Sequence, residues 1–121
     1  MLKTLIALIT VFTVGCSQSV NLQLAPQVNA YVHSNSQQAI PLTINDPVYK
    51  ELNDWLSMNH QDWLTTSGRY PGGVYIKSND HGIQVTPLKV VIYSSSAGDT
   101  KALYIKHIGP EDLKLTKKLG Q

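Results

Sequence analysis

Residues 73–93, GVYIKSNDHGIQVTPLKVVIY, decide the class of fold. The alternating pattern of residues 73–78 is typical of a strand with one buried face. Residues 79–82 have the composition of a turn, and residues 83–93 predict a longer strand that Pro87 kinks or bulges. Two such strands joined by a short turn indicate an antiparallel hairpin.

The chain beyond this hairpin continues the same pattern. Residues 94–100 are polar and predict a loop, after which residues 101–108 return as a further strand. Residues 110–118 leave two alternatives open. They are acidic at the start and basic at the end, as the dipole of a short helix prefers, but they are equally compatible with a frayed tail.

A helix is predicted over residues 47–59, upstream of the hairpin. Asp46 suits the N-cap, and Pro47 suits the first helical position, where its missing N–H costs nothing. The apolar side chains fall on one face at helical spacing: Val48, Leu52, Trp55 and Leu56. The helix therefore has one face to bury.

Two weaker strands are predicted at residues 20–24 and 28–32, with a break at Pro26. The expected fold class is α+β: one amphipathic helix packed on an antiparallel sheet of about four to five strands. The side chains expected to face the helix are Val74, Ile76, Ile83, Val85, Leu88, Val90, Ile92, Leu103 and Ile105. Those expected on the opposite face are Tyr75, Lys77, Lys89, Val91, Tyr93, Tyr104 and Lys106.

The first residues have the pattern of a secretory signal. Lys3 is followed by an apolar run over residues 5–14, which ends at Gly15 before a polar stretch. A helix that spans a membrane needs about 20 apolar residues, so this run is too short to be one. We expect the segment to be removed rather than retained.

Residues 13–16, TVGC, resemble the lipobox of bacterial lipoproteins. The resemblance implies that the signal is cut before Cys16, that the thiol carries a diacylglycerol and that the new amino group is acylated. Ser17, in place of aspartate, implies attachment to the outer membrane on its periplasmic side. The alternative is ordinary cleavage near Gly15 or Ser17, which would leave Cys16 free to pair with another chain.

The expected division of the chain is a signal peptide at residues 1–15, a lipidated N-terminus and tether at 16–27, and one small domain at 28–121. Because Cys16 is the sole cysteine, no disulfide remains to stabilise the domain. The signal contains one of the ten Lys and Arg residues and none of the eight Asp and Glu residues. The mature chain is therefore nearly neutral, which argues against a nucleic-acid partner.

No catalytic or metal-binding pattern emerges from the polar residues. The four histidines are scattered, none paired at the spacing of a helical zinc site, so neither a metal nor a cofactor is predicted. Ser94–Ser96 lack the glycines that flank a nucleophilic serine. A hydrolase that uses His60 or His81 with a nearby carboxylate remains the alternative from another functional class.

A binding face is the sharper expectation, formed by Tyr75, Lys77, Tyr93, Tyr104 and Lys106. Tyrosine suits interfaces because it offers a large area and a polar tip with little rotamer entropy to lose. Alternatively, these side chains serve the sheet and bind no partner, either by packing against one another across strands or by being covered by the first two strands. Arg69 and Tyr70, in a glycine-rich loop, are a further exposed candidate.

These observations favour a non-enzymatic binding module on the outer membrane, facing a periplasmic protein or cell-wall material. An inhibitor or immunity protein is one specific version. A structural subunit of an envelope complex is a third class, alongside the hydrolase.

Overall fold

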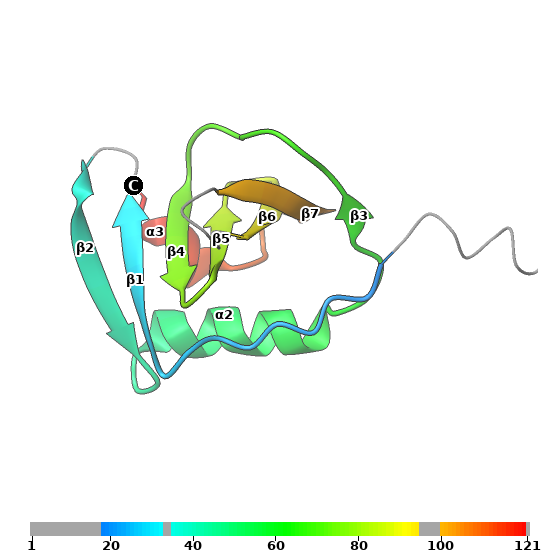
Figure 1. The fold of residues 1–121 in the computed structure, drawn as a ribbon. Coiled ribbons are helices and arrows are strands. Elements are labelled where there is room, and N and C mark those ends of the chain that lie inside the picture. Colours follow the sequence, from blue (N-terminus) through cyan, green and yellow to red (C-terminus); the bar gives the residue numbers. More distant parts are fainter. Residues whose placement is uncertain (1–17, 33–34, 95–99, 121) are drawn as a thin grey trace, which may run out of the picture.

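The computed structural model describes residues 18–32, 35–94 and 100–120, which form an α+β fold. In these residues one antiparallel sheet has seven strands, in the order β2-β1-β4-β5-β6-β7-β3, so the expected four to five strands were too few (Figure 1). The elements are β1 (Gln27–Val32), β2 (Asn35–Thr43), α2 (Pro47–Met58), β3 (Leu64–Thr65), β4 (Val74–Ser78), β5 (His81–Val85), β6 (Lys89–Ser94), β7 (Lys101–His107) and α3 (Lys114–Lys118).

Residues 83–93 form two strands rather than one kinked strand. Thr86 closes a turn by donating its N–H to the carbonyl of Lys89, at 2.9 Å, while its hydroxyl accepts the N–H of Lys89 at 3.1 Å. Pro87, which has no N–H to donate, lies exposed in this turn. Leu88 is 61% exposed there, so the prediction that it faces the helix is wrong.

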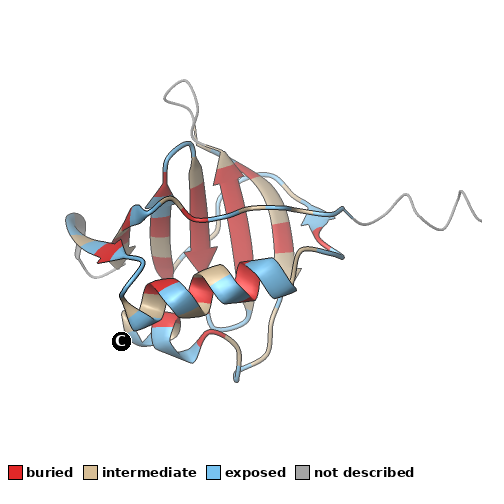
Figure 2. Cartoon of the chain, turned by 90° about the horizontal axis from the view of Figure 1, so that it is seen from below, coloured by how far each residue is buried: buried red, intermediate tan, exposed pale blue. Residues whose placement is uncertain are grey.

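The helix α2 lies across one face of the sheet, as predicted (Figure 2). Its buried side chains are Tyr49, Leu52, Trp55 and Leu56. They meet the inward side chains of four strands: Val28, Ala30, Val74, Ile76, Ile83, Val85, Val90 and Ile92. Burying such aliphatic side chains contributes roughly 1.5–3 kcal/mol each, so this layer is the main source of stability.

Asp46 does not cap α2 with its side chain. Its carboxylate instead accepts the N–H of Thr43, at 2.7 Å, and the hydroxyl of the same residue, at 3.3 Å. Asp46 therefore occupies the N-cap position, as predicted, but its side chain stabilises the turn between β2 and α2 instead of the helix end. The prediction that Pro47 is the first residue of the helix is also confirmed.

The residues assigned to a tether, 16–27, lie against the domain from Gln18 onwards. Gln18 exchanges two backbone hydrogen bonds with Trp63, at 2.7 and 2.9 Å. Leu24 is buried, and its N–H donates to Oδ1 of Asn53 at 3.1 Å. The segment follows α2 as an extended chain and not as the expected strand at 20–24, whereas the expected strand at 28–32 is found within β1 (Figure 1).

The C-terminal segment ends in a helix rather than a frayed tail. The carboxylate of Glu51 on α2 accepts the backbone N–H groups of Leu115 and Thr116, at 3.0 and 2.9 Å. The same carboxylate accepts the Thr116 hydroxyl at 2.8 Å, and Thr116 is fully buried. This interaction fixes α3 beside α2 on the same side of the sheet.

A bulge reverses the faces of β7. Ile92 pairs with Tyr104, but Tyr93 pairs with Ala102, so Leu103 is an extra residue in the ladder. One extra residue moves every following side chain to the other face. Tyr104 therefore packs with the core on the helix side and Ile105 lies on the opposite face, the reverse of the prediction.

Candidate binding site on the sheet face opposite the helices

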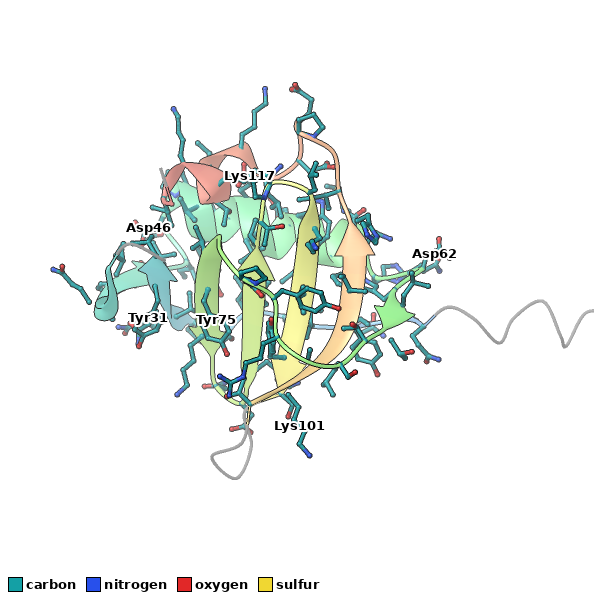
Figure 3. All side chains as sticks on the ribbon, turned by 90° about the horizontal axis from the view of Figure 1, so that it is seen from above. Tyr31, Asp46, Asp62, Tyr75, Lys101 and Lys117 are labelled. Atoms are coloured by element: carbon teal, nitrogen blue, oxygen red, sulfur yellow. The ribbon has the colours of Figure 1, made fainter. Side chains whose placement is uncertain are left out.

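The face of the sheet that turns away from the helices is covered in part by the loop between β3 and β4. This loop arches over the strands in Figure 1, and Figure 3 shows it crossing them from above. Beneath it lies a second, smaller apolar cluster. Its buried members are Val91, Tyr93, Ala102 and Ile105, with Tyr70 and Tyr75 packed against them.

Gln84 fastens the loop to the sheet. Its side-chain amide donates to the carbonyls of Tyr70 and Gly72, each at 2.7 Å. Its Oε1 accepts the hydroxyl of Tyr93 at 2.5 Å, and the N–H of Tyr70 donates to that hydroxyl at 3.4 Å. Gln84 is only 6% exposed, so these bonds satisfy a polar side chain that would otherwise be costly to bury.

The loop is held at its outer end as well. The hydroxyls of Thr66 and Tyr70 share a hydrogen bond. Nζ of Lys89 lies 5.1 Å from the centre of the Tyr70 ring, within the range of a cation–π contact. Tyr70 is therefore fixed at its backbone, its ring and its hydroxyl.

A glycine makes room for a tyrosine ring on the sheet under the loop. Gly82 lies between Lys77 and Tyr93 in the cross-strand row, and it has no side chain that would compete for this space. The ring of Tyr75 leans over it, since a Cβ at Gly82 would collide with the Tyr75 ring and hydroxyl. The rings of Tyr75 and Tyr93 lie 5.8 Å apart at an angle of 59°.

The result is an open cavity of about 350 Å³, which we call the tyrosine hollow. It is lined by Arg69, Tyr70, Tyr75, Lys77, Gln84, Tyr93 and Thr100. Arg69 and Lys77 give it two positive charges, and none of the described residues that line it is acidic. Its walls thus combine aromatic rings with cations, and the volume lies in the range of small-ligand sites.

The two phenols in the hollow stay protonated. Burial raises the pKa of Tyr75, and the neighbouring Tyr93 raises it further. Burial also raises the pKa of Tyr93, while the N–H of Tyr70 and the charge of Arg69 act in the opposite direction. At neutral pH both hydroxyls can therefore donate hydrogen bonds.

Three of the five residues predicted for a binding face meet in this hollow: Tyr75, Lys77 and Tyr93. Tyr104 and Lys106 do not, because of the bulge in β7. Lys106 donates to the carbonyl of Gln61, at 2.7 Å, and its Nζ lies 5.9 Å from the centre of a Trp63 ring.

The loop pair Arg69 and Tyr70 joins the site, as its composition suggested, while Gln84 and Thr100 were missed. A glutamine between Ile83 and Val85 was the signal for Gln84, because a polar side chain inside an apolar strand needs partners.

The histidines of the hydrolase alternative lie elsewhere. His60 follows the end of α2 and lines a small pocket with residues 21–23, and His81 is the first residue of β5. Neither lines the tyrosine hollow. Within residues 18–32, 35–94 and 100–120, no group of three or more His, Cys, Asp or Glu side chains is placed to hold a metal ion.

No family model, curated protein or solved structure matches the chain, so the site is defined by its geometry alone. Cys16 and the residues before it lie outside the described part. No helix in the described part is long and apolar enough to cross a bilayer.

Proposed function

We propose that this chain is a lipid-anchored, non-enzymatic binding module of the bacterial outer membrane, which holds an envelope ligand in the tyrosine hollow. The observation that carries the proposal is the hollow itself: a cavity of about 350 Å³ with aromatic walls and two cations. It is built by the rings of Tyr75 and Tyr93 and by a loop that Gln84 holds in place.

The anchoring part rests on the lipobox resemblance of residues 13–16. Each buried methylene contributes about 0.8 kcal/mol, and a single acyl chain gives only marginal binding. Two or more chains on Cys16 would hold the protein stably on the membrane. Trp63 supports close attachment, since its bridge to Gln18 begins two residues after the cysteine.

Two residues span at most about 7 Å, so a lipidated Cys16 would hold the domain against the bilayer with little tether. The end of the domain near this point exposes apolar side chains, Leu64 at 44% and Met58 at 77%. These side chains are suited to the interfacial region of a membrane.

A binding role suits the hollow better than a catalytic one. Nucleophilic or acid–base catalysis needs a nucleophile with a base, or a pair of carboxylates, within hydrogen-bond reach. Among the described residues of the hollow, Thr100 has no histidine or carboxylate beside it in the lining. A cavity of about 350 Å³ is large enough to take one ring-sized group, such as cell-wall material could offer.

Photo-crosslinking in intact cells tests the contact. Thr100, which lines the hollow, is replaced by a benzophenone amino acid, and Lys50, exposed on α2, receives the same substitution as the control. We expect irradiation to give adducts in the envelope fraction from position 100 and not from position 50. No adduct from position 100, or equal adducts from both positions, would rule out the hollow as the contact.

A further inference from the structure

Two cations of the tyrosine hollow have no partner among the residues that the structure describes. Lys106 and Lys117 donate to backbone carbonyls, and Lys114 pairs with Glu111 at 2.6 Å. By contrast, Arg69 and Lys77 have neither an ion pair nor a side-chain hydrogen bond within residues 18–32, 35–94 and 100–120. Because no described residue that lines the hollow is acidic, its two cations are suited to an external anion.

Three acceptors at the hollow, by contrast, already accept hydrogen bonds from the protein. Oε1 of Gln84 accepts the Tyr93 hydroxyl, and the carbonyls of Tyr70 and Gly72 accept the Gln84 amide. What is left to meet a ligand is mainly a set of donors: the guanidinium of Arg69, the ammonium of Lys77 and the hydroxyl of Tyr75. A ligand that complements donors offers oxygen acceptors, and charged acceptors bind most strongly.

Tyrosine rings form much of the rest of the cavity wall. The ring of Tyr75 covers Gly82, and the rings of Tyr75 and Tyr93 lie 5.8 Å apart at an angle of 59°. Tyrosine rings at such a site supply a large, rigid contact area. Because Arg69 and Lys77 line the same cavity, one ligand can offer an anionic group to the cations and a ring-sized body to the tyrosines.

We infer that the tyrosine hollow binds a small organic oxyanion, a carboxylate or phosphate group carried on a ring-sized body. This rests on the proposed function, in which the hollow is the contact of the module. The oxyanion lies between Arg69 and Lys77, and the ring lies against Tyr75 and Tyr93. The selectivity is electrostatic: a neutral ring of the same size binds more weakly, and a cationic ring is repelled.

The test uses the full-length protein, purified in neutral detergent and labelled with ¹⁵N, and follows amide shifts during titration. The probes share one ring and differ in charge: glucuronate and glucose 6-phosphate are anionic, glucose is neutral and glucosamine is cationic. Benzoate replaces the sugar ring by an aromatic one. Comparing glucuronate with glucose 6-phosphate separates a carboxylate from a phosphate as the preferred group.

For ligands of this size we expect a roughly millimolar Kd for the preferred anion. Its saturable shifts should centre on Gly82, Gln84 and Lys77, and its affinity should exceed that of glucose by about tenfold. Glucosamine should cause no saturable shift.

Charge reversal provides the matched control. Arg69→Glu and Lys77→Glu should each weaken anion binding by about tenfold, whereas Lys50→Glu, with the same charge change on exposed α2, should leave it unchanged. All three positions are exposed, so the fold should survive, and an unchanged pattern of distant amide shifts confirms it.

Three outcomes would each overturn the inference. They are equal affinities for glucose and glucuronate, a loss of affinity in Lys50→Glu as large as in Arg69→Glu and Lys77→Glu, or no saturable shift with any anion. Crosslinks from position 100 without anion preference would overturn the ligand class alone. Absence of those crosslinks would overturn the proposed contact.

Discussion

Replacement of Gln84 by leucine should destabilise the protein more than any exposed polar substitution. Leucine has a similar size but cannot make the three hydrogen bonds that join Gln84 to Tyr70, Gly72 and Tyr93. Each such bond contributes about 0.5–1.5 kcal/mol net, and a buried polar group left without a partner costs about 1–3 kcal/mol. Tyr93 is 5% exposed, so water cannot readily replace its lost acceptor.

We therefore expect Gln84→Leu to lower the free energy of unfolding by about 3 kcal/mol. For a domain of this size, 1 kcal/mol corresponds to about 4–8 °C in Tm, so the midpoint should fall by roughly 15 °C. Urea unfolding and thermal melts monitored by circular dichroism measure both quantities. Hydrogen exchange should accelerate over residues 66–73, because the loop loses its fastening to β5.

Gln23→Leu is the matched control, since Gln23 is exposed on the segment beside α2. It should change the stability by no more than about 0.5 kcal/mol. If Gln84→Leu were as mild as this control, the hydrogen bonds of Gln84 would not hold the loop and the hollow would lack its proposed support.

Glu51→Ala should lower the free energy of unfolding by about 1–2 kcal/mol and abolish the protection of α3 against hydrogen exchange. The control Asp54→Ala, at an exposed position of the same helix, should have little effect. Protection of α3 that survives Glu51→Ala would refute the role of Glu51. Because the pKa of Tyr93 is raised in the fold, the folded state binds more protons than the unfolded state above pH 10, and the free energy of unfolding should fall as pH rises through this range. Tyr93→Phe should make this dependence on pH less steep than the control Tyr104→Phe does, as measured by urea unfolding at several pH values. Equal steepness in the two variants would contradict the prediction. Gly82→Ala should displace the Tyr75 ring, lower the free energy of unfolding by about 1–3 kcal/mol and weaken the binding of the anionic probes. If the NMR shifts of the Tyr75 ring were the same as in the wild type, the glycine would not shape the site.

The parts of the fold that local sequence patterns determine could be predicted. Apolar spacing placed α2 within one residue at its C-terminal end, and alternation placed β4. The edge strand β2 was missed because its sequence, NSQQAIPLT, does not alternate clearly and contains Pro41. Proline is tolerated at a sheet edge, but only the pairing with β1 shows that this segment lies there.

The faces of β7 depend on its partner rather than on its own sequence. The residues 101–107 alternate well enough to predict a strand, but the bulge at Leu103 arises from its register with β6. A one-residue shift exchanges the two faces, so Tyr104 and Ile105 were predicted on the wrong sides. Tyr75, Lys77 and Tyr93 precede the bulge, and for them the alternation gave the correct face.

The hollow could not be predicted from the sequence, because it depends on contacts between distant parts of the chain. Gln84 bonds to carbonyls 12 and 14 residues away, and these bonds bring Arg69 and Tyr70 over the sheet. The packing of residues 18–25 on α2 is also non-local, since a polar segment with sparse apolar residues has the composition of a tether. It is held by the few apolar side chains that reach the core, such as Leu24, and by hydrogen bonds such as the one that Tyr49 donates to the carbonyl of Ala25, at 2.7 Å.

Membrane attachment through Cys16 is the claim on which the proposed location depends. The most direct measurement is the intact mass and membrane fractionation of the expressed full-length protein beside a Cys16→Ala variant. The proposal predicts a lipid-sized mass increase and recovery in the outer membrane, both abolished by the substitution. A soluble, unmodified wild-type protein cleaved near Ser17 would contradict it and leave Cys16 as a thiol free to pair with another chain.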